Sequence, residues 1–334
     1  MTAGQVTPAG VRVLPAPQGP RIPAVPYMYH NGQIVRYDEV SFTPAVQGLH
    51  YGTGVFEGIR AYWDGTTGKA HVVQARKHWE RFQDSARLLR LDVPISVDEL
   101  VDITLDLLRR NAYRGDVYLR PLAHKLSIEP GGSFGVGLRN VSTAFSVYLV
   151  PMPGHPTGRR IRCAVSSWRR VPDTSIPARA KITGSYVNIA LAIDEARSGG
   201  YDDAILLNQH GTVAEASTAN VFVVRGGQLI TPSADADILS GITRSCAIEL
   251  AHQELGKVVA ERPVLRSELY TADEVFLTGT GCELVGVGEI DGRPIGNGAV
   301  GPITARLADA YAGAVRGVAP RYTHWLTSTD LQAE

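Results

Sequence analysis

Apolar residues recur along this chain with two distinct periods, and together they predict a mixed α/β protein. Residues 76–91 place Trp79, Phe82 and Ala86 on one face of a helix with a period near 3.6 residues. Residues 97–110 repeat that period. Both segments are therefore predicted to be amphipathic helices, each with one apolar face turned to a core.

Short apolar runs bounded by turn residues predict the strands. The segment 27–42 holds two such runs around Asn31-Gly32, a pair typical of a tight hairpin turn. Val117–Leu122 and Thr143–Val150 have the same strand character. Further strands are predicted over 161–168, 202–208, 220–232 (with a turn at Gly226-Gly227) and 273–279, and further helices over 186–197 and 243–255.

The length of the chain predicts two domains, because single hydrophobic cores stop growing at about 250–300 residues and this chain has 334. The segment PMPGHPTGRR carries three prolines between positions 151 and 156, which predicts an interdomain linker over 151–158. The expected organisation is a flexible N-terminal arm (1–26), a small α/β domain (27–150) and a larger domain (159–334).

Composition narrows the class of protein. Lys+Arg and Asp+Glu both number 33, and this balance argues against a nucleic-acid-binding surface. No apolar run approaches the roughly 18 residues of a membrane span. The three cysteines, Cys163, Cys246 and Cys282, show no C-x-x-C spacing, which fits the reducing cytoplasm. The histidines show no ligand spacing, so no metal site is expected.

Three residues carry the most specific chemistry. Lys181 lies among small residues in ARAKITGSY, Tyr186 follows five positions later, and Glu215 lies 34 residues downstream of the lysine. A lysine amine can form a Schiff base with the aldehyde of pyridoxal 5'-phosphate (PLP), and a carboxylate can keep its pyridine nitrogen protonated. Since most lysines are solvated surface charges, this motif alone does not establish a cofactor site.

Other segments could bind anions. The glycine in SGITR (240–244) precedes a predicted helix, whose free N–H groups suit a phosphate, although a plain helix cap is an equal alternative. The turn 278–281 and Arg81 could add phosphate donors, or be an ordinary turn and a surface charge. Tyr118 and Arg120 are two residues apart in a predicted strand, so both side chains project from the same face. This arrangement fits a carboxylate site or a salt bridge on an edge strand.

The glycine-rich segment GLHYGTGVFEGIRAY (48–62) does not have the G-x-G-x-x-G spacing of a dinucleotide loop. Tyr51 and Phe56 within it could form the apolar wall of a pocket. Dense glycine and aromatic residues also occur in turns that are simply tightly packed.

These segments occur in the same order as in the fold-type IV PLP enzymes, and the chain most closely resembles the branched-chain amino acid aminotransferases. The resemblance covers about residues 27 to 312, and the lysine, glutamate and GITR segments are highly specific to fold type IV. It rests on HYGTGVFEGIRAY, HWERFQDSARLLRL, VYLRPL, SSWRRVPDTSIPARAKITGSYVN, GYDDAILLNQHGTVAEASTANVF, SGITR and ADEVFLTGTGCELV.

The resemblance implies a D-amino acid aminotransferase-like fold, with a small N-terminal α/β domain, a larger C-terminal pseudo-barrel domain and the active site between them in a homodimer. Lys181 would be the catalytic Schiff-base lysine, Tyr186 would contact the ring oxygen, and Glu215 would pair with the pyridinium. The phosphate and the ring face would be held by Arg81, Ile242, Thr243, Thr280 and Leu239.

The resemblance also implies the substrate contacts. Tyr51, Phe56 and Gly58 would line the side-chain pocket. Tyr118, Arg120 and the Thr280-Gly281 turn would bind substrate carboxylates. Two departures concern substrate recognition: the turn continues as Gly-Cys-Glu, where the family more usually has alanine, and the segment LSIEPGGSFGVGLRN, expected to be a loop that closes the neighbouring subunit's pocket, is longer and richer in glycine.

The expected reaction is a ping-pong transamination between leucine, isoleucine or valine and 2-oxoglutarate. The alternatives on the same fold are a D-amino acid or (R)-amine transaminase and aminodeoxychorismate lyase, but the segment 118–121 (YLRP) favours the branched-chain enzymes. A cofactor-free scaffold or binding protein is a further alternative, and Lys181, Tyr186 and Glu215 argue against it.

Overall fold

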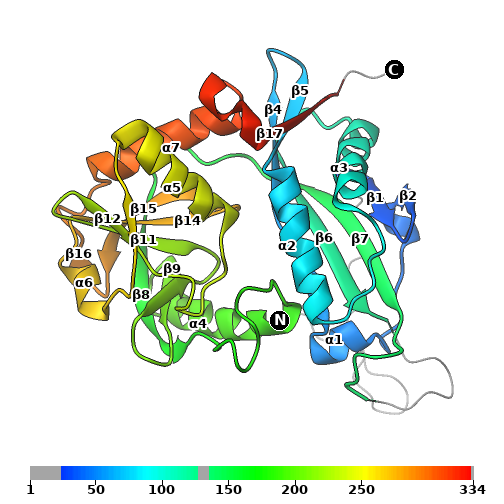
Figure 1. The fold of residues 1–334 in the computed structure, drawn as a ribbon, viewed down its shortest axis with the longest axis horizontal. Coiled ribbons are helices and arrows are strands. Elements are labelled where there is room, and N and C mark those ends of the chain that lie inside the picture. The colour runs from blue at the N-terminus through cyan, green and yellow to red at the C-terminus, as the bar shows by residue number, and fades with distance from the viewer. Residues whose placement is uncertain (1–23, 127–134, 332–334) are drawn as a thin grey trace, which may run out of the picture.

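Two β-sheets organise the protein (Figure 1). The computed structural model describes residues 24–126 and 135–331, so nearly all of the predicted arm, and the middle of the segment 126–140, lie outside the described residues. Within the described part, no helix has the length and apolar character needed to cross a membrane.

The first sheet is antiparallel throughout, in the order β17-β5-β4-β6-β7-β1-β2, with β3 paired to β6. The edge strand β17 comes from the C-terminal part of the chain and lies beside β5 (Figure 1). The strands are β1 (Tyr27–His30), β2 (Gln33–Arg36), β3 (Gly54–Phe56), β4 (Ile59–Asp64), β5 (Lys69–Val73), β6 (Val117–Lys125), β7 (Thr143–Pro151) and β17 (Leu326–Asp330).

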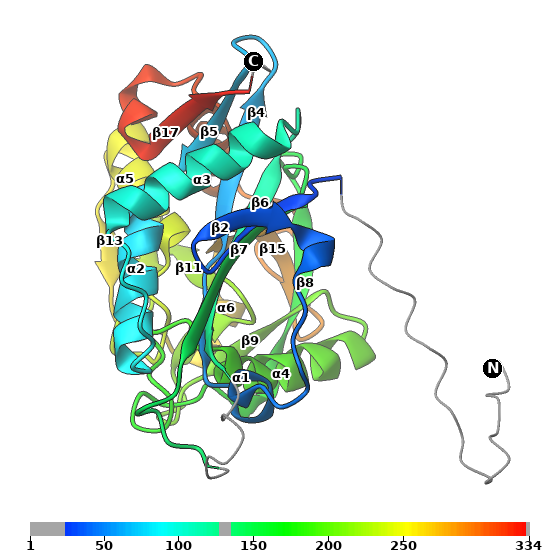
Figure 2. The same cartoon turned by 90° about the vertical axis from the view of Figure 1, so that its right-hand side faces the viewer.

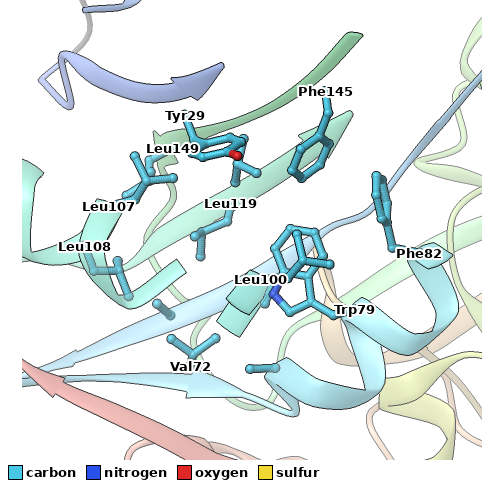
Figure 3. Close-up of a cluster of buried hydrophobic side chains, with 14 of the residues drawn as sticks. Tyr29, Val72, Trp79, Phe82, Leu100, Leu107, Leu108, Leu119, Phe145 and Leu149 are labelled. Carbon is cyan, nitrogen blue, oxygen red and sulfur yellow. The ribbon is translucent and has the colours of Figure 1, made fainter. Parts of the chain in front are cut away.

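Helices α2 (Ala75–Leu88) and α3 (Val97–Asn111) cover one face of this sheet. α3 begins at a capping box, in which the Ser96 hydroxyl accepts from the N–H of Glu99 and the Glu99 carboxylate accepts from the N–H of Ser96. Figure 3 shows the resulting core, where Trp79 is fully buried against side chains from the strands. Each such large side chain contributes about 1.5–3 kcal/mol through burial.

The second sheet mixes parallel and antiparallel pairs in the order β10-β9-β8-β15-β14-β11-β12-β13, with β16 paired to β15. It curls around its own apolar cluster. Its strands are β8 (Arg160–Arg169), β9 (Asp203–Leu207), β10 (Val213–Ala216), β11 (Asn220–Arg225), β12 (Gln228–Thr231), β13 (Val259–Glu261), β14 (Glu274–Gly279), β15 (Glu283–Ile290) and β16 (Arg293–Pro294).

Helices flank the second sheet. α5 and α7 pack on a face where Phe222 and Phe276 stack with their ring centroids 4.8 Å apart. α4 packs against β8 and β9. The remaining helices are α1 (Gln47–Tyr51), α4 (Tyr186–Ser198), α5 (Ile242–Leu255), α6 (Arg266–Tyr270) and α7 (Pro302–Val315), and the 3-10 helices are η1 (Tyr37–Glu39), η2 (Thr183–Ser185) and η3 (Pro320–Trp325).

Candidate active site

A cavity of about 420 Å³ lies between the two sheets. The first half of the chain lines it from β3, α2 and β6, and the second half lines it from β10, the start of α5 and the turn after β14. Predicted site residues converge there from both halves: Phe56, Gly58, Arg81, Tyr118, Arg120, Lys181, Tyr186, Glu215, Leu239, Ile242, Thr243, Thr280 and Gly281.

Lys181 is fixed in the cavity by its backbone. Its N–H donates to the Ser85 hydroxyl (3.2 Å), and its carbonyl accepts from the N–H of Phe56 (3.0 Å). Its Nζ donates to the Tyr186 hydroxyl (2.7 Å). Burial, together with the nearby charge of Arg81, lowers the pKa of Lys181. The lysine is therefore more easily obtained as a neutral amine, which is the form that acts as a nucleophile or a base.

Glu215, on β10, is a buried carboxylate with several donors. Arg170 Nε donates to one oxygen (2.8 Å), and Asn220 Nδ2 (3.1 Å) and the N–H of Leu239 (3.0 Å) donate to the other. Burial raises the pKa of Glu215, although the charge of Arg170 opposes that shift. Arg170 and Asn220 were not predicted as site residues. Arg170 lies 45 residues before Glu215, so its pairing has no local signal in the sequence, whereas Asn220 lies five residues after Glu215 in the same motif and could have been found there.

The start of α5 forms one end of the cavity. Its cap residue Gly241 has no side chain that could accept from the first N–H groups of the helix, which leaves these groups available to an anion. Arg81 reaches the same place from α2, and its Nη1 donates to the Ser240 carbonyl (2.9 Å). Arg81, Ile242 and Thr243 together form a site that suits a phosphate.

A buried carboxylate that was not predicted from the sequence holds Arg81 in place. Glu57 is fully buried and accepts from Arg81 Nε (2.7 Å), Arg81 Nη2 (2.9 Å) and His78 Nδ1 (2.8 Å). Burial alone would raise the pKa of Glu57, but the charge of Arg81 and the hydrogen bond from His78 outweigh it and hold that pKa far below its usual range. Two of the three Arg81 nitrogens are thus committed to Glu57.

Tyr118 and Arg120 lie on one face of β6 and both line the cavity. Arg120 Nη2 donates to the Tyr118 hydroxyl (3.3 Å), and the Arg120 guanidinium lies 4.5 Å from the centroid of the Phe56 ring. Gly58 has to be glycine, because a Cβ there would overlap the Tyr118 hydroxyl. The side of the cavity near β6 thus combines an aromatic wall with one cation.

One predicted pocket residue lies elsewhere. Tyr51 ends α1, its side chain is 42% exposed, and it is not among the residues that line the cavity within this chain. Across residues 24–126 and 135–331, no group of three or more His, Cys, Asp and Glu side chains is arranged to hold a metal ion.

Comparisons with known proteins agree on a single family. Residues 54–290 match the family Amino-transferase class IV. A probable branched-chain-amino-acid aminotransferase of Aquifex aeolicus (strain VF5) is 46% identical over 304 residues, which cover 90% of this chain and 96% of the relative.

Solved structures show the same relationship. The branched-chain amino acid aminotransferase of Thermobaculum terrenum in its PLP form has a TM-score of 0.86 and 38% identity, covering 91% of this chain and 98% of that one. The T.th. branched-chain amino acid aminotransferase complexed with N-(5'-phosphopyridoxyl)-L-glutamate has a TM-score of 0.84 and 39% identity, covering 90% of this chain and 97% of that one.

The two sheets, and the lysine, tyrosine and buried carboxylate around the cavity between them, define an aminotransferase. The chain belongs to the class IV aminotransferase family. Members of this family are PLP enzymes, and the predicted fold of a smaller N-terminal part and a larger curled C-terminal part is confirmed.

Proposed function

We propose that the protein is a PLP-dependent transaminase that moves the amino group between leucine, isoleucine or valine and 2-oxoglutarate. The observation that carries this proposal is the Lys181 amine, which donates to Tyr186 in a cavity that also holds Glu215 and the free end of α5. The names of the relatives support the branched-chain substrates, and the glutamate adduct of the T.th. enzyme supports an acidic partner substrate.

The residues present fit PLP. Glu215 would face the pyridine nitrogen and Tyr186 the ring oxygen, and one nitrogen of Arg170, Nη1, has no partner within the described residues although it is buried at the cavity. A bound acceptor would satisfy that nitrogen. The remaining contacts would be with the phosphate and the ring face, from Arg81, Ile242, Thr243, Thr280 and Leu239.

When bound, the cofactor supplies an electron sink for the bonds around the substrate α-carbon. Lys181 is the covalent attachment point, and its lowered pKa suits it to take the α-proton and return it. Burial, and next to it the charge of Glu215, raises the pKa of Tyr186, so its phenol stays a hydrogen-bond donor. The same residues serve an amino acid and then a 2-oxo acid, which gives ping-pong kinetics.

A single side-chain site would accept both substrates. Phe56 and Tyr118 offer an apolar surface to a branched chain, and Arg120 offers a charge to the γ-carboxylate of glutamate. The Thr280-Gly281 turn would bind the α-carboxylate. A carboxylate without a partner costs several kcal/mol to bury, so the apolar wall alone would reject the acidic substrate.

We further propose that the enzyme is a homodimer. Exposed apolar side chains lie on two helices: Leu49 (74% exposed) and Tyr51 (42%) on α1, and Val187 (64%) and Leu191 (41%) on α4. The end of α1 meets the segment before α4, where the N–H of Gly184 donates to the carbonyl of Gly52 (3.2 Å), and Figures 1 and 2 show the two helices next to each other there. Exposed apolar side chains gathered in this way are typical of an interface. Tyr51 would then reach the cavity of the partner subunit.

A reduction experiment tests the proposed function. Protein mixed with PLP should absorb near 400 nm, and borohydride should fix the cofactor to Lys181, as mapped by peptide mass. Lys181→Ala should fold but carry no adduct, while Lys77→Ala, a change on the exposed face of α2, should keep it. An adduct on another lysine in Lys181→Ala would contradict the assignment, and the absence of any band would favour a scaffold protein.

A substrate panel then separates the related activities. Leucine, glutamate, D-alanine and (R)-1-phenylethylamine should be offered to the same PLP-loaded sample, with 2-oxoglutarate or pyruvate as acceptor. Turnover of leucine and glutamate alone is the expected result. Turnover of D-alanine or the amine would instead assign the protein to the D-amino acid or (R)-amine transaminases.

A further inference from the structure

Glu283 has an unusual backbone conformation next to the proposed substrate site. It follows directly on the Thr280–Cys282 turn, whose first two residues line the cavity, and its φ is 60°. A residue with a side chain rarely adopts this left-handed conformation, and it persists only where the surroundings hold it. Glu283 itself does not line the cavity, and its side chain is buried.

The carboxylate of Glu283 joins three parts of the chain. Tyr62, on β4 of the first sheet, donates its hydroxyl to Oε1 (2.7 Å), and Arg60 Nη2 lies 3.6 Å from the same oxygen. The N–H of His155, in the predicted linker, donates to Oε2 (3.1 Å). His155 Nε2 also lies 3.1 Å from the carbonyl oxygen of Gly281, so the linker contacts the turn twice.

The first-sheet partners are as deeply buried as core residues. Arg60 and Tyr62 are each 1% exposed, and the guanidinium lies 4.9 Å from the centroid of the tyrosine ring. Arg60 Nη2 donates to the Met152 carbonyl (2.9 Å), while Nε and Nη1 have no partner within the part of the chain that the structure describes. A buried cation with so few hydrogen bonds depends on the nearby carboxylate of Glu283.

A second ion pair anchors the same linker. Arg316, just after α7, pairs with Asp116 Oδ2 (2.8 Å), which also accepts from the N–H of Gly154 (3.1 Å). The Arg316 guanidinium lies 5.3 Å from the Tyr62 ring. The linker is therefore fixed at Met152, Gly154 and His155, and the turn beside it is fixed through Glu283.

We propose that Glu283, Tyr62 and Arg60 are positioning residues that hold the Thr280-Gly281 turn in its substrate-binding place. The affinity of the site for a substrate carboxylate then depends on a contact between the first sheet and the turn of the second. None of the three lines the cavity, so they act on binding only through the turn. The inference rests on the proposed role of that turn.

The consequence for kinetics follows from which groups move. Without the Tyr62 hydroxyl, Glu283 loses its shortest hydrogen bond and its backbone is free to leave the left-handed region. The turn then shifts, and substrate carboxylates bind less well. Lys181 and Glu215 lie on other segments, so the chemical step is not affected. KM should rise while kcat stays nearly constant, as for a loss of uniform binding.

Two tyrosine variants provide a matched test. Tyr62→Phe and Tyr322→Phe each remove a buried hydroxyl that donates to a glutamate over 2.7 Å, the second to Glu254, and Tyr322 does not line the cavity. Both should lower the melting temperature by similar amounts. Only Tyr62→Phe should raise the KM for leucine and 2-oxoglutarate, by about tenfold, which is the size expected for the loss of one hydrogen bond to a charged group. Its kcat should stay within about twofold of the wild-type value.

Ligand binding provides a readout that does not require turnover. The Kd of the PLP-loaded protein for 4-methylpentanoate, a carboxylate with the leucine side chain and no amino group, should rise about tenfold in Tyr62→Phe and stay unchanged in Tyr322→Phe. This measurement remains decisive even if the wild-type protein fails to transaminate, a result that would count against the proposed function alone. Equal Kd values in all three proteins would overturn the inference.

A second variant covers the case in which Tyr62→Phe does not fold. Glu283→Gly relieves the backbone, because glycine tolerates a φ of 60°, but it removes the whole carboxylate network. The Kd for 4-methylpentanoate should rise at least as much as in Tyr62→Phe. A Kd equal to that of the wild type would show that the turn needs only its backbone conformation, and the positioning role would be wrong.

Discussion

Burial and neighbouring charges set the protonation of single residues in this site. The pKa of Lys181 is lowered by burial and by the charge of Arg81, while burial raises the pKa of both Tyr186 and Glu215. An amine that loses its proton more easily than usual, a phenol that keeps its proton and a carboxylate with a raised proton affinity thus share one cavity. Shifts of this kind suit groups that transfer protons at a substrate carbon.

Removing the charge of Glu215 should remove the electron sink. Glu215→Gln keeps the shape of the side chain but cannot hold a proton on the pyridine nitrogen, so we expect the half-reaction with leucine to slow by several orders of magnitude while PLP stays bound. Single-turnover absorbance measures that rate. Glu274→Gln is the matched control, since Glu274 is also buried but binds the start of α7, outside the cavity. A near-normal rate in Glu215→Gln would refute the role.

Arg120 should matter more for the acidic substrate than for the apolar one. Arg120→Leu leaves the γ-carboxylate of glutamate buried without a partner. The kcat/KM for glutamate should therefore fall by a factor that corresponds to about 2–4 kcal/mol, while the kcat/KM for leucine should change little. Arg120→Lys keeps the charge but not the planar guanidinium, so its kcat/KM for glutamate should lie between those of the wild type and Arg120→Leu. Steady-state kinetics on both substrates measures the difference. Equal losses would show that Arg120 binds the α-carboxylate or is structural.

Whole elements were predictable where an apolar period was strong. Helices α2 to α5 lie within a few residues of their predicted bounds. The hairpin of β1 and β2 was predicted over 27–42, but its second strand ends at Arg36 and the 3-10 helix η1 follows. α7 (PITARLADAYAGAV) was missed because its many alanines and its glycine blur the amphipathic pattern. β17 (LTSTD) was missed because it has almost no apolar character, and its strand form depends on pairing with β5.

Site residues were likewise predictable only where the sequence carries a local signal. Residues in local motifs, such as Lys181 and Glu215, were identified, and the structure brings them together in one cavity. Glu57, His78 and Arg170 were missed because each acts on another side chain and becomes recognisable only when distant segments meet. The individual roles of the identified residues stay predictions until they are measured.

Helix α2 carries a buried histidine, His78, whose titration should appear in the pH dependence of stability. His78 and Arg81 are one turn apart and both bind Glu57, and burial lowers the pKa of His78. Its folded pKa thus lies below the unfolded value of about 6.5, so the unfolded chain takes up the proton first. The stability linked to His78 is complete above about pH 6.5 and is lost as the pH falls, by at most about 1.4 kcal/mol per pH unit.

The pH dependence of the melting temperature in two histidine variants tests this prediction. His78→Asn should lower the overall melting temperature and flatten its decline between about pH 7 and pH 5, while the exposed His252→Asn should leave the decline unchanged. The two groups that bind each other beside His78 titrate outside this window, because the pKa of Glu57 is held far below its usual range and the pKa of Arg81 is raised. An unchanged slope in His78→Asn would show that another group causes the acid sensitivity.

Across the whole molecule, the first and the last strand of the described residues, β1 and β17, belong to the same sheet. The first sheet holds β1 to β7 and also β17, which brings residues 326–330 back beside β5. The boundary between the sheets falls where the linker 151–158 was predicted to lie, and the domain division itself stays a prediction. The cavity uses side chains from both sheets, so the site exists only when the two parts pack together.

Self-association should depend on the exposed apolar surface of α1 and α4. Charges at Val187 and Leu191 would have to be buried in the proposed dimer, which is costly without a partner, so Val187→Lys combined with Leu191→Lys should give a monomer by sedimentation. Val258→Lys, in the turn between α5 and β13, is the control, because Val258 is 82% exposed and should stay so. If Tyr51 reaches the cavity of the partner, the monomer should also bind substrate more weakly. A wild-type monomer, or a double variant with unchanged mass, would contradict the proposed interface.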